Sequence, residues 1–391
     1  MKNKTLLILA ILILALAACN LSQPAATPTS VPPTPLPTQA APASPAESSL
    51  LRISFPDAST GWALASANTG AVLRTSDGGA TWLDVTPPGL TGIGYSTTLS
   101  VLNVATAWVL APNADYLSGK LYRTSDAGLT WTSFDAPFGG GYLQFLDAST
   151  GFALADLGAG AGSQAVELFQ TTDGGATWLS VFNDDPTRPD SSGSLPLGGI
   201  KSGMTFLDAS TGWVTGERPV NGEVYLFVTH NGGLDWAEQT IPLPSGYDAY
   251  MYLPQAPVFF GNDGFLPLMV DLPATSVITF YTTHDGGSTW SGNPSNSASQ
   301  VPLGSRYTFA DSTHGWSWDG GASIYVTTDA AQTWSALPTS LNLGDNLAQV
   351  VFVPASGGAY NGWALTGQDS AGHSQLYRTT DNGSTWTQLV P

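Results

Sequence analysis

Short runs that alternate apolar and polar residues, or that are rich in aromatic residues, recur from residue 50 to the end of the chain. Clusters of Asp, Gly and Ser separate these runs, and the combination is typical of strands joined by tight turns. No helical periodicity of useful length appears after residue 50. The pattern therefore predicts an almost entirely β body, whose first four strands cover residues 51–55, 62–66, 72–76 and 81–85.

One eight-residue pattern, T-x-D-x-G-x-x-W, occurs seven times between the third and fourth strands of each predicted unit. We call it the repeat turn. Its Trp residues are 44 to 58 residues apart, and a second element, F-x-D-x-x-x-G-W or a variant of it, precedes each copy. Four-stranded units repeated seven times at this period predict a seven-bladed β-propeller of four-stranded blades, built from residues 50–391.

Each residue type in the repeat turn has a physical reason. The Asp accepts hydrogen bonds from backbone N–H groups of its own loop, the Gly permits a positive φ, and the Trp buries its ring between neighbouring blades. Asn231 keeps an acceptor where the other copies have Asp, whereas Ala331, in place of Gly, is expected to strain or reshape the sixth turn. The residues at the acceptor position are Asp77, Asp126, Asp173, Asn231, Asp285, Asp329 and Asp381.

The repeat turn resembles the Asp-box, or BNR repeat, of sialidases, xyloglucan hydrolases, sortilin-type receptors and the photosystem II stability and assembly factor family. Together with the F-x-D-x-x-x-G-W element, it is most similar to the last of these. The resemblance covers residues 50–391. It implies the propeller fold and is much less specific for function.

The N-terminus has the features of a targeting signal. Two Lys residues precede an apolar core, residues 6–18, which is too short to cross a bilayer of about 30 Å as a helix but suits a signal peptide. The sequence that closes it, Leu-Ala-Ala-Cys, resembles the bacterial lipobox, which implies that residues 1–18 are removed and that Cys19 carries lipid, typically including palmitate. The alternative is an ordinary secretory signal. Residues 19–49, rich in Pro, Thr, Ala and Ser, predict a disordered linker after the lipidated Cys.

The composition excludes several classes of protein. The formal net charge is −18 with only 11 Lys and Arg, which argues against a nucleic-acid-binding surface. A single Cys excludes an internal disulfide framework. The one long apolar run lies at the N-terminus, which excludes a polytopic membrane protein. Together these features predict a monomeric propeller on the extracytoplasmic face of a bacterial membrane, attached through its lipid anchor only.

The two faces of the predicted ring differ. The turns on one face are short and repetitive, whereas the loops on the opposite face vary in length. Variable loops on a repeated scaffold are where an individual binding function resides. We therefore expect a ligand site on the second face, in the loops 112–118, 156–164, 183–199, 242–253 and 291–304.

Two of these loops contain candidate ligand-binding side chains. Tyr247, Tyr250 and Tyr252 share one loop and are candidates to stack on a sugar or to grip a peptide; the alternative is a loop packed on itself. Another loop contains three acids whose spacing differs from that of an EF-hand, so ordinary solvated carboxylates are favoured over a Ca²⁺ site and no metal site is predicted. These acids are Asp184, Asp185 and Asp190.

A basic feature stands out in this acidic chain. Arg74, Arg123 and Arg378 occupy the same place, three residues before the Asp of the repeat turn, in units one, two and seven. These units become neighbours if the ring closes, which predicts a basic arc near the repeat turns. The photosystem assembly family is associated with an arginine-rich surface that engages partners, so the arc is a candidate partner-binding site. Alternatively, the Arg stems pack beside Tyr or Trp within the blade.

No catalytic residue can be selected. The chain lacks the Arg-Ile-Pro motif of sialidases and has only four Glu beyond the linker, and its Asp residues are too scattered to single out the carboxylate pair that glycoside hydrolysis needs. The sequence therefore favours a non-catalytic interaction or assembly scaffold for an unknown envelope protein or glycan, without a cofactor. The alternative is a carbohydrate-binding or glycoside-hydrolysing, sialidase-like surface protein.

Overall fold

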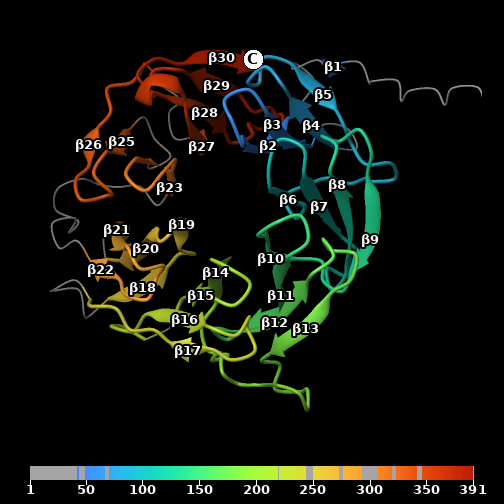
Figure 1. The fold of residues 1–391 in the computed structure, drawn as a ribbon, viewed down its shortest axis with the longest axis vertical. Coiled ribbons are helices and arrows are strands. Elements are labelled where there is room, and N and C mark those ends of the chain that lie inside the picture. The colour runs from blue at the N-terminus through green and yellow to red at the C-terminus, as the bar shows by residue number, and fades with distance from the viewer. Residues whose placement is uncertain are drawn as a thin grey trace, which may run out of the picture. The chain divides into compact units, whose positions relative to one another are not determined.

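A computed structural model describes residues 42–43, 49–66, 70–218, 220–243, 250–272, 276–292, 306–318, 323–340 and 346–390. These residues form seven antiparallel sheets arranged as a ring, the seven-bladed propeller that the repeats predict (Figure 1). Within each sheet the four main strands follow one another in chain order. The signal peptide, Cys19 and most of the predicted linker lie outside the described residues. None of the described helical segments is long and apolar enough to cross a membrane.

The strands of the first three blades have the following bounds. Blade 1 comprises β2 (Leu50–Ser54), β3 (Gly61–Ala65), β4 (Ala71–Thr75) and β5 (Trp82–Asp84); blade 2 comprises β6 (Thr98–Val101), β7 (Ala107–Pro112), β8 (Gly119–Thr124) and β9 (Thr132–Ala136); blade 3 comprises β10 (Gly141–Phe145), β11 (Gly151–Gly160), β12 (Ser163–Thr171) and β13 (Leu179–Asn183).

The remaining four blades follow the same plan. Blade 4 comprises β14 (Lys201–Phe206), β15 (Gly212–Gly216), β16 (Tyr225–Thr229) and β17 (Ala237–Glu238); blade 5 comprises β18 (Met251–Pro254), β19 (Val258–Phe260), β20 (Asp263–Asp271), β21 (Ser276–Thr283) and β22 (Ser291–Gly292); blade 6 comprises β23 (Arg306–Phe309), β24 (Gly315–Trp318), β25 (Ile324–Thr327) and β26 (Ser335–Ala336); blade 7 comprises β27 (Leu347–Pro354), β28 (Tyr360–Thr366), β29 (Leu376–Thr379) and β30 (Thr387–Val390).

The structure differs from the sequence prediction in the strand bounds of blade 1 and in one additional strand. The first three strands of blade 1 begin and end one residue earlier than predicted, because backbone pairing rather than residue type sets their ends. Within the predicted disordered linker, β1 (Pro42–Ala43) pairs with β5 as a further edge strand of blade 1. Pro occurs in edge strands because one side of such a strand has no neighbour and needs no N–H donor.

The repeat turn is held by one Thr and one Asp. The Thr75 hydroxyl donates to Asp77 Oδ1 at 2.8 Å and accepts the N–H of Gly79 at 2.9 Å. Asp77 in turn accepts the backbone N–H of Thr81 at 2.9 Å and its hydroxyl at 2.6 Å. Equivalent bonds occur in blades 2, 3, 5, 6 and 7. The predicted acceptor role of the Asp is confirmed.

Hydrogen bonding keeps these carboxylates ionised. The hydroxyl and backbone N–H of Thr177 lower the pKa of Asp173 to about 2, against desolvation that raises it. The hydroxyl and N–H of Thr289 likewise lower the pKa of Asp285 to about 2. Since the pKa falls on folding, this stabilisation is present above the ordinary Asp pKa near 3.8 and is lost as the pH falls toward 2.

The two unusual repeat turns keep the common geometry. In blade 4, Asn231 Oδ1 accepts the N–H of Asp235 at 3.1 Å while its amide donates back to Asp235 Oδ2 at 3.2 Å, so donor and acceptor are exchanged rather than lost. In blade 6, Ala330 and Ala331 adopt φ of 59° and 61°, and the Ala331 N–H still reaches Thr327 Oγ1 at 3.0 Å. The sixth turn therefore retains its shape with two non-Gly residues in the left-handed region, which is the strain predicted there.

Aromatic stacking joins the blades. In six blades, a Phe at or near the end of the first strand, or in β19 of blade 5, packs on an aromatic ring at the start of the second strand of the preceding blade, with centroids 3.6 to 4.9 Å apart. The Trp of the repeat turn then packs against that Phe at 5.9 to 6.3 Å. The stacked pairs are Trp363–Phe55, Trp108–Phe145, Phe152–Phe206, Phe265–Phe309 and Trp316–Phe352, whereas the rings of Trp213 and Phe259 are tilted by 35°.

The Gly of the F-x-D-x-x-x-G-W element makes room for this Phe. A Cβ at the Gly would lie 2.4 to 2.6 Å from the Phe ring of the same blade, closer than any side-chain contact allows. Blade 2 lacks both residues: it has Val101 in place of Phe and Ala107 in place of Gly. At that junction Trp131 packs directly against Trp62 at 6.3 Å. The Gly positions are Gly61, Gly151, Gly212, Gly264, Gly315 and Gly362.

Side chains close the ring between blades 7 and 1, which lie side by side in Figure 1. Trp363 Nε1 donates to the carbonyl of Gly78 at 2.8 Å. The Gln349 side chain accepts the N–H of Ile53 at 3.0 Å and donates to its carbonyl at 2.8 Å. The amide thus satisfies both backbone groups of Ile53, in the way that the backbone of a paired strand does. The described strands of blade 1 and blade 7 each come from one end of the chain, so no strand exchange closes the ring.

The coupling between Phe and Gly can be tested in blade 4. Gly212→Ala drives a methyl group into the Phe206 ring and should cost about 1–3 kcal/mol of unfolding free energy. Phe206→Val alone opens a cavity at the junction and should also destabilise the protein. The double variant reproduces the Val and Ala pair of blade 2 and should lose less than the sum of the two, as urea denaturation would measure. Strict additivity would contradict the steric interpretation.

Candidate functional site

The three arginines of the predicted basic arc lie at consecutive blade junctions. Each is paired in register with the aromatic residue of the neighbouring second strand, and its guanidinium lies over that ring: Arg74 over Trp62 at 5.8 Å, Arg123 over Trp108 at 5.8 Å and Arg378 over Trp363 at 5.7 Å. The strands that carry them, β4, β8 and β29, are on adjacent blades in Figure 1. The structure therefore places the three on neighbouring blades, as the sequence predicts.

Each guanidinium also reaches the next blade. Arg378 donates to the carbonyls of Asp77 and Ala58 at 3.3 Å each, and Arg123 donates to the carbonyl of Asp173 at 3.4 Å. Arg74 reaches the carbonyl of Val104 at a longer 3.5 Å. All three side chains remain half-buried. They therefore pack beside Trp within their own blade, as the alternative interpretation predicts, and in addition bridge to the next blade while part of each side chain stays exposed to solvent.

The tyrosine loop only partly fits a binding role. Tyr247 lies outside the described residues. Tyr252 belongs to β18 and is fully buried among core residues of blades 4 and 5, so its ring is not open to a ligand. Tyr250 packs partly buried against the same cluster. The candidate binding role of Tyr252 is corrected in favour of the packed alternative, because pairing of β18 with β20 turns that side chain into the blade junction.

The three acids of the 183–199 loop have separate partners. Asp184 faces Lys201, Asp185 accepts the N–H and hydroxyl of Thr187, and Asp190 forms a bidentate pair with Arg188. Among the described residues no group of three or more His, Cys, Asp or Glu is placed to hold a metal ion. The loop uses these acids for local contacts.

A buried ion pair lies beneath this loop. The side chain of Lys201 is fully buried, and its Nζ donates to the carbonyls of Gln164 at 2.8 Å and Pro196 at 2.9 Å. The same ammonium lies 3.7 Å from Asp184 Oδ2 and 5.2 Å from the centre of the Tyr225 ring. Burial lowers the pKa of Lys201, which the Asp184 carboxylate opposes, and burial raises the pKa of Asp184. The pair ties blade 3 to blade 4.

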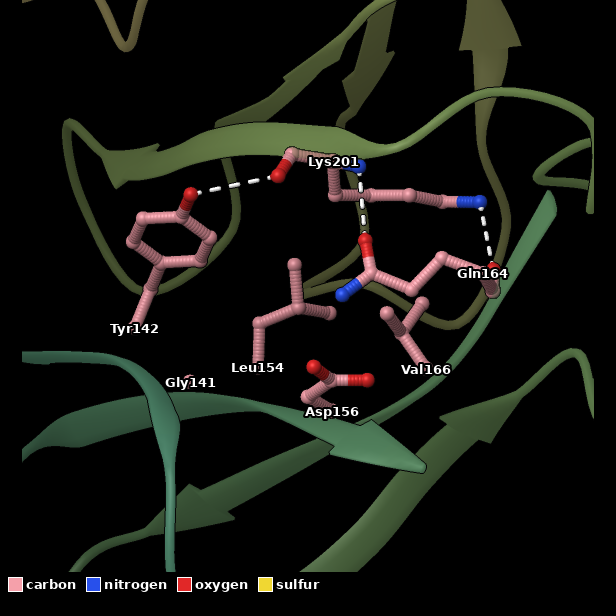
Figure 2. A pocket seen from close by; sticks show the side chains of 7 residues that line it. All are labelled: Gly141, Tyr142, Leu154, Asp156, Gln164, Val166 and Lys201. Atoms are coloured by element: carbon pink, nitrogen blue, oxygen red, sulfur yellow. Dashed lines mark hydrogen bonds between the residues drawn. The ribbon is translucent and has the colours of Figure 1, made fainter. Parts of the chain in front are cut away.

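Next to this pair is a pocket of about 290 Å³ (Figure 2). Its lining residues lie where β11 ends and β12 begins, so the pocket is on the face opposite the repeat turn that follows β12. Strands β10, β11 and β12 of blade 3 form most of it, and the start of β14 closes one side. Its lining comprises Gly141, Tyr142, Leu154, Asp156, Gln164, Val166 and Lys201. The pocket lies on the face where the sequence predicts a ligand site.

One predicted loop at this pocket is a strand hairpin. The Gly-rich segment 156–164 continues the pairing of β11 with β12, with a bulge between Asp156 and Gly158. Ala161 and Gly162 form the two-residue turn, with φ of 51° and 76°, the positive values that such hairpin turns require. The prediction of a loop was wrong because backbone pairing does not depend on side chains, and the many glycines obscured the strand pattern.

The sequence interpretation missed Tyr142, Gln164 and Lys201. Lys201 carried a usable signal, since it is one of few basic residues and begins a strand that is mostly buried. Tyr142 and Gln164 had no distinguishing pattern. They meet Lys201 only across the junction between blades 3 and 4.

The buried pair yields a stability prediction. Lys201→Met leaves Asp184 buried without its counter-ion and should cost about 3–5 kcal/mol of unfolding free energy. Adding Asp184→Asn removes the stranded charge and keeps an acceptor for the N–H of Val166, so the double variant should recover part of the loss. Urea denaturation of both variants measures this. A double variant less stable than Lys201→Met would show that the pair is not the dominant interaction.

Comparison with solved structures identifies proteins of similar fold. A structure of YCF48 bound to D1 peptide is 14% identical with a TM-score of 0.51, over 88% of this chain and 93% of that chain. YCF48 from Cyanidioschyzon merolae is 18% identical with a TM-score of 0.50, over 82% and 94%. A PL25 polysaccharide lyase, an ulvan lyase bound to -[GlcA(1-4)Rha3S]-, is 10% identical with a TM-score of 0.50, over 87% and 92%.

No protein-family model and no curated protein matches the sequence. At these identities the likeness concerns the fold, which photosystem assembly proteins and a polysaccharide lyase share. The described part of the chain is a seven-bladed propeller like that of the photosystem II assembly factor YCF48.

Proposed function

We propose that this chain is a membrane-anchored, extracytoplasmic scaffold that binds a partner protein of the cell envelope without catalysis. The binding surface is the basic arc formed by Arg74, Arg123 and Arg378. The observation that carries the proposal is the placement of these three cations on adjacent blades in a chain of net charge −18. The surface suits a partner segment that carries carboxylates.

The geometry of the arc supports a binding role. Each guanidinium is held over a Trp ring and by hydrogen bonds to the next blade, so little side-chain entropy remains to be lost on binding. Arginine also offers several donors in a fixed fork, which suits a carboxylate. A partly exposed cation that is already ordered is a better anchor than a mobile surface Lys.

The fold comparison is consistent with a scaffold. One of the YCF48 structures holds a D1 peptide, which shows that a protein of this fold binds a peptide. The lyase of similar fold binds a saccharide, so the fold alone leaves the choice open. We favour a protein partner because many of the acids of this chain are already used in turns and ion pairs, as Asp77 and Asp173 illustrate.

Charge at the arc should control partner binding. A triple variant with Gln at Arg74, Arg123 and Arg378 removes the charges, and Gln170 already occupies the equivalent place in blade 3, so the fold should tolerate it. Capture of envelope proteins by this variant should fall about tenfold or more, since hydrogen bonds to charged groups are lost. Quantitative mass spectrometry of captured proteins, at low and high salt, measures the change.

A triple Lys variant is the matched control, because it keeps the three charges and loses only the forked geometry. It should retain most of the capture, and thermal unfolding should confirm that both variants are folded. Equal capture by the wild type and the Gln variant would rule out the basic arc as the partner-binding surface. Turnover of chromogenic glycosides that one Asp substitution abolishes would instead favour the alternative, a carbohydrate-active surface protein.

Membrane anchoring is proposed to depend on Cys19. Cys19→Ala removes the only thiol of the chain and with it the site of diacylation. The expected result is release of the protein from the membrane fraction into the soluble extracytoplasmic fraction. Cell fractionation with immunoblotting measures this, with Cys19→Ser as a second variant. Persistent sedimentation with membranes would contradict lipidation.

A further inference from the structure

The pocket between blades 3 and 4 contains a buried amide group without a full set of partners. Gln164 is only 8% exposed, and its Oε1 accepts the backbone N–H of Lys201 at 2.7 Å. Because an N–H must face an oxygen, this bond decides which amide atom is the oxygen. The Nε2 group is therefore directed to the other side, into the pocket (Figure 2), where no described residue accepts from it.

A carboxylate lies in the same pocket. Asp156 Oδ1 accepts the N–H of Gly158 at 2.8 Å, which holds the side chain in place. Among the described residues, none donates to its second oxygen. In Figure 2 the carboxylate lies on the side of the pocket toward which the Gln164 amide nitrogen points. The pocket thus offers one donor on a buried side chain and one acceptor on the exposed side chain of Asp156.

The other walls are apolar or aromatic. Leu154 and Val166 line the base, and the aliphatic stem of Lys201 crosses above them, with its ammonium bonded to the Gln164 carbonyl. Tyr142 forms the remaining wall; it is 38% exposed, and its hydroxyl donates to the Lys201 carbonyl at 3.2 Å, which fixes the ring. A ligand here meets a flat ring on one side and aliphatic groups on another.

We propose that this pocket binds one neutral sugar ring of a glycan. A sugar hydroxyl both accepts and donates, so one hydroxyl, or two on adjacent carbons, satisfies Gln164 Nε2 and Asp156 together. The C–H face of a pyranose fits against Tyr142 and the aliphatic side chains. The volume of about 290 Å³ accommodates a single ring.

A cationic side chain fits the pocket less well. Lys and Arg carry no acceptor, so either would pair with Asp156 and leave the buried Gln164 amide unsatisfied. A carboxamide side chain of a peptide has both a donor and an acceptor, but it lacks a C–H face to cover Tyr142. These differences favour a saccharide.

This inference goes beyond the proposed scaffold function. The pocket is on the face opposite the repeat turns, so partner binding at the arginine arc and sugar binding in the pocket are separate. The proposal of sugar binding can therefore be wrong while the proposal of partner binding is right, and the reverse.

The test uses saturation-transfer NMR on the full-length protein in a detergent without a sugar headgroup. The probes are methyl β-D-glucopyranoside, methyl β-D-galactopyranoside and N-acetyl-D-glucosamine, with N-acetyl-L-glutamine amide as the peptide-side-chain probe. At least one saccharide should receive saturation. Asp156→Asn should weaken its binding about tenfold, because a hydrogen bond to a charged acceptor is lost. Tyr142→Ala should also weaken it.

A matched control, Asp271→Asn, removes an acid at the end of β20 in blade 5, outside the pocket, and should keep wild-type binding. Far-ultraviolet circular dichroism and thermal unfolding check that each variant is folded. The proposal is overturned if no saccharide receives saturation, if Asp156→Asn binds as well as the wild type, or if only the glutamine amide binds.

Discussion

The stacking of aromatic rings across blade junctions is the interaction on which the rest of this structure depends. The described residues form seven buried clusters, and each draws its side chains from two neighbouring blades. A single four-stranded blade therefore cannot bury its own apolar surface and needs a neighbour on each side. Blades 7 and 1 bury each other's apolar surface, with Trp363 stacked on Phe55. The ring therefore closes without exchanging a strand.

The repeated polar turns complement this apolar construction. Each carboxylate is ionised and hydrogen-bonded within its own loop, as in Asp77 and Asp173, so it holds the hairpin that presents the Trp to the junction. The exchange of donor and acceptor between Asn231 and Asp235 shows that the turn needs a pair of complementary groups rather than one residue type. Much of the negative charge thus serves the fold.

Function is then left to the places where blades differ from one another. On the repeat-turn face, the difference is Arg in place of Gln, Val or Thr at three consecutive junctions. On the opposite face, it is the extended β11–β12 hairpin with the buried pair of Lys201 and Asp184 beside it. In both places the scaffold immobilises a charged or polar side chain before any ligand arrives, which lowers the entropic cost of binding.

The sequence by itself determined the number of blades, the position of their turns and the neighbouring placement of Arg74, Arg123 and Arg378. These follow from patterns within about 50 residues, where hydrogen bonds are local and the same residues recur seven times. Only the tertiary structure decided that Tyr252 is buried and that the glycine-rich segment 156–164 is a hairpin. It alone assembled the pocket, because Tyr142 and Lys201 are 59 residues apart and meet only where two blades pack together.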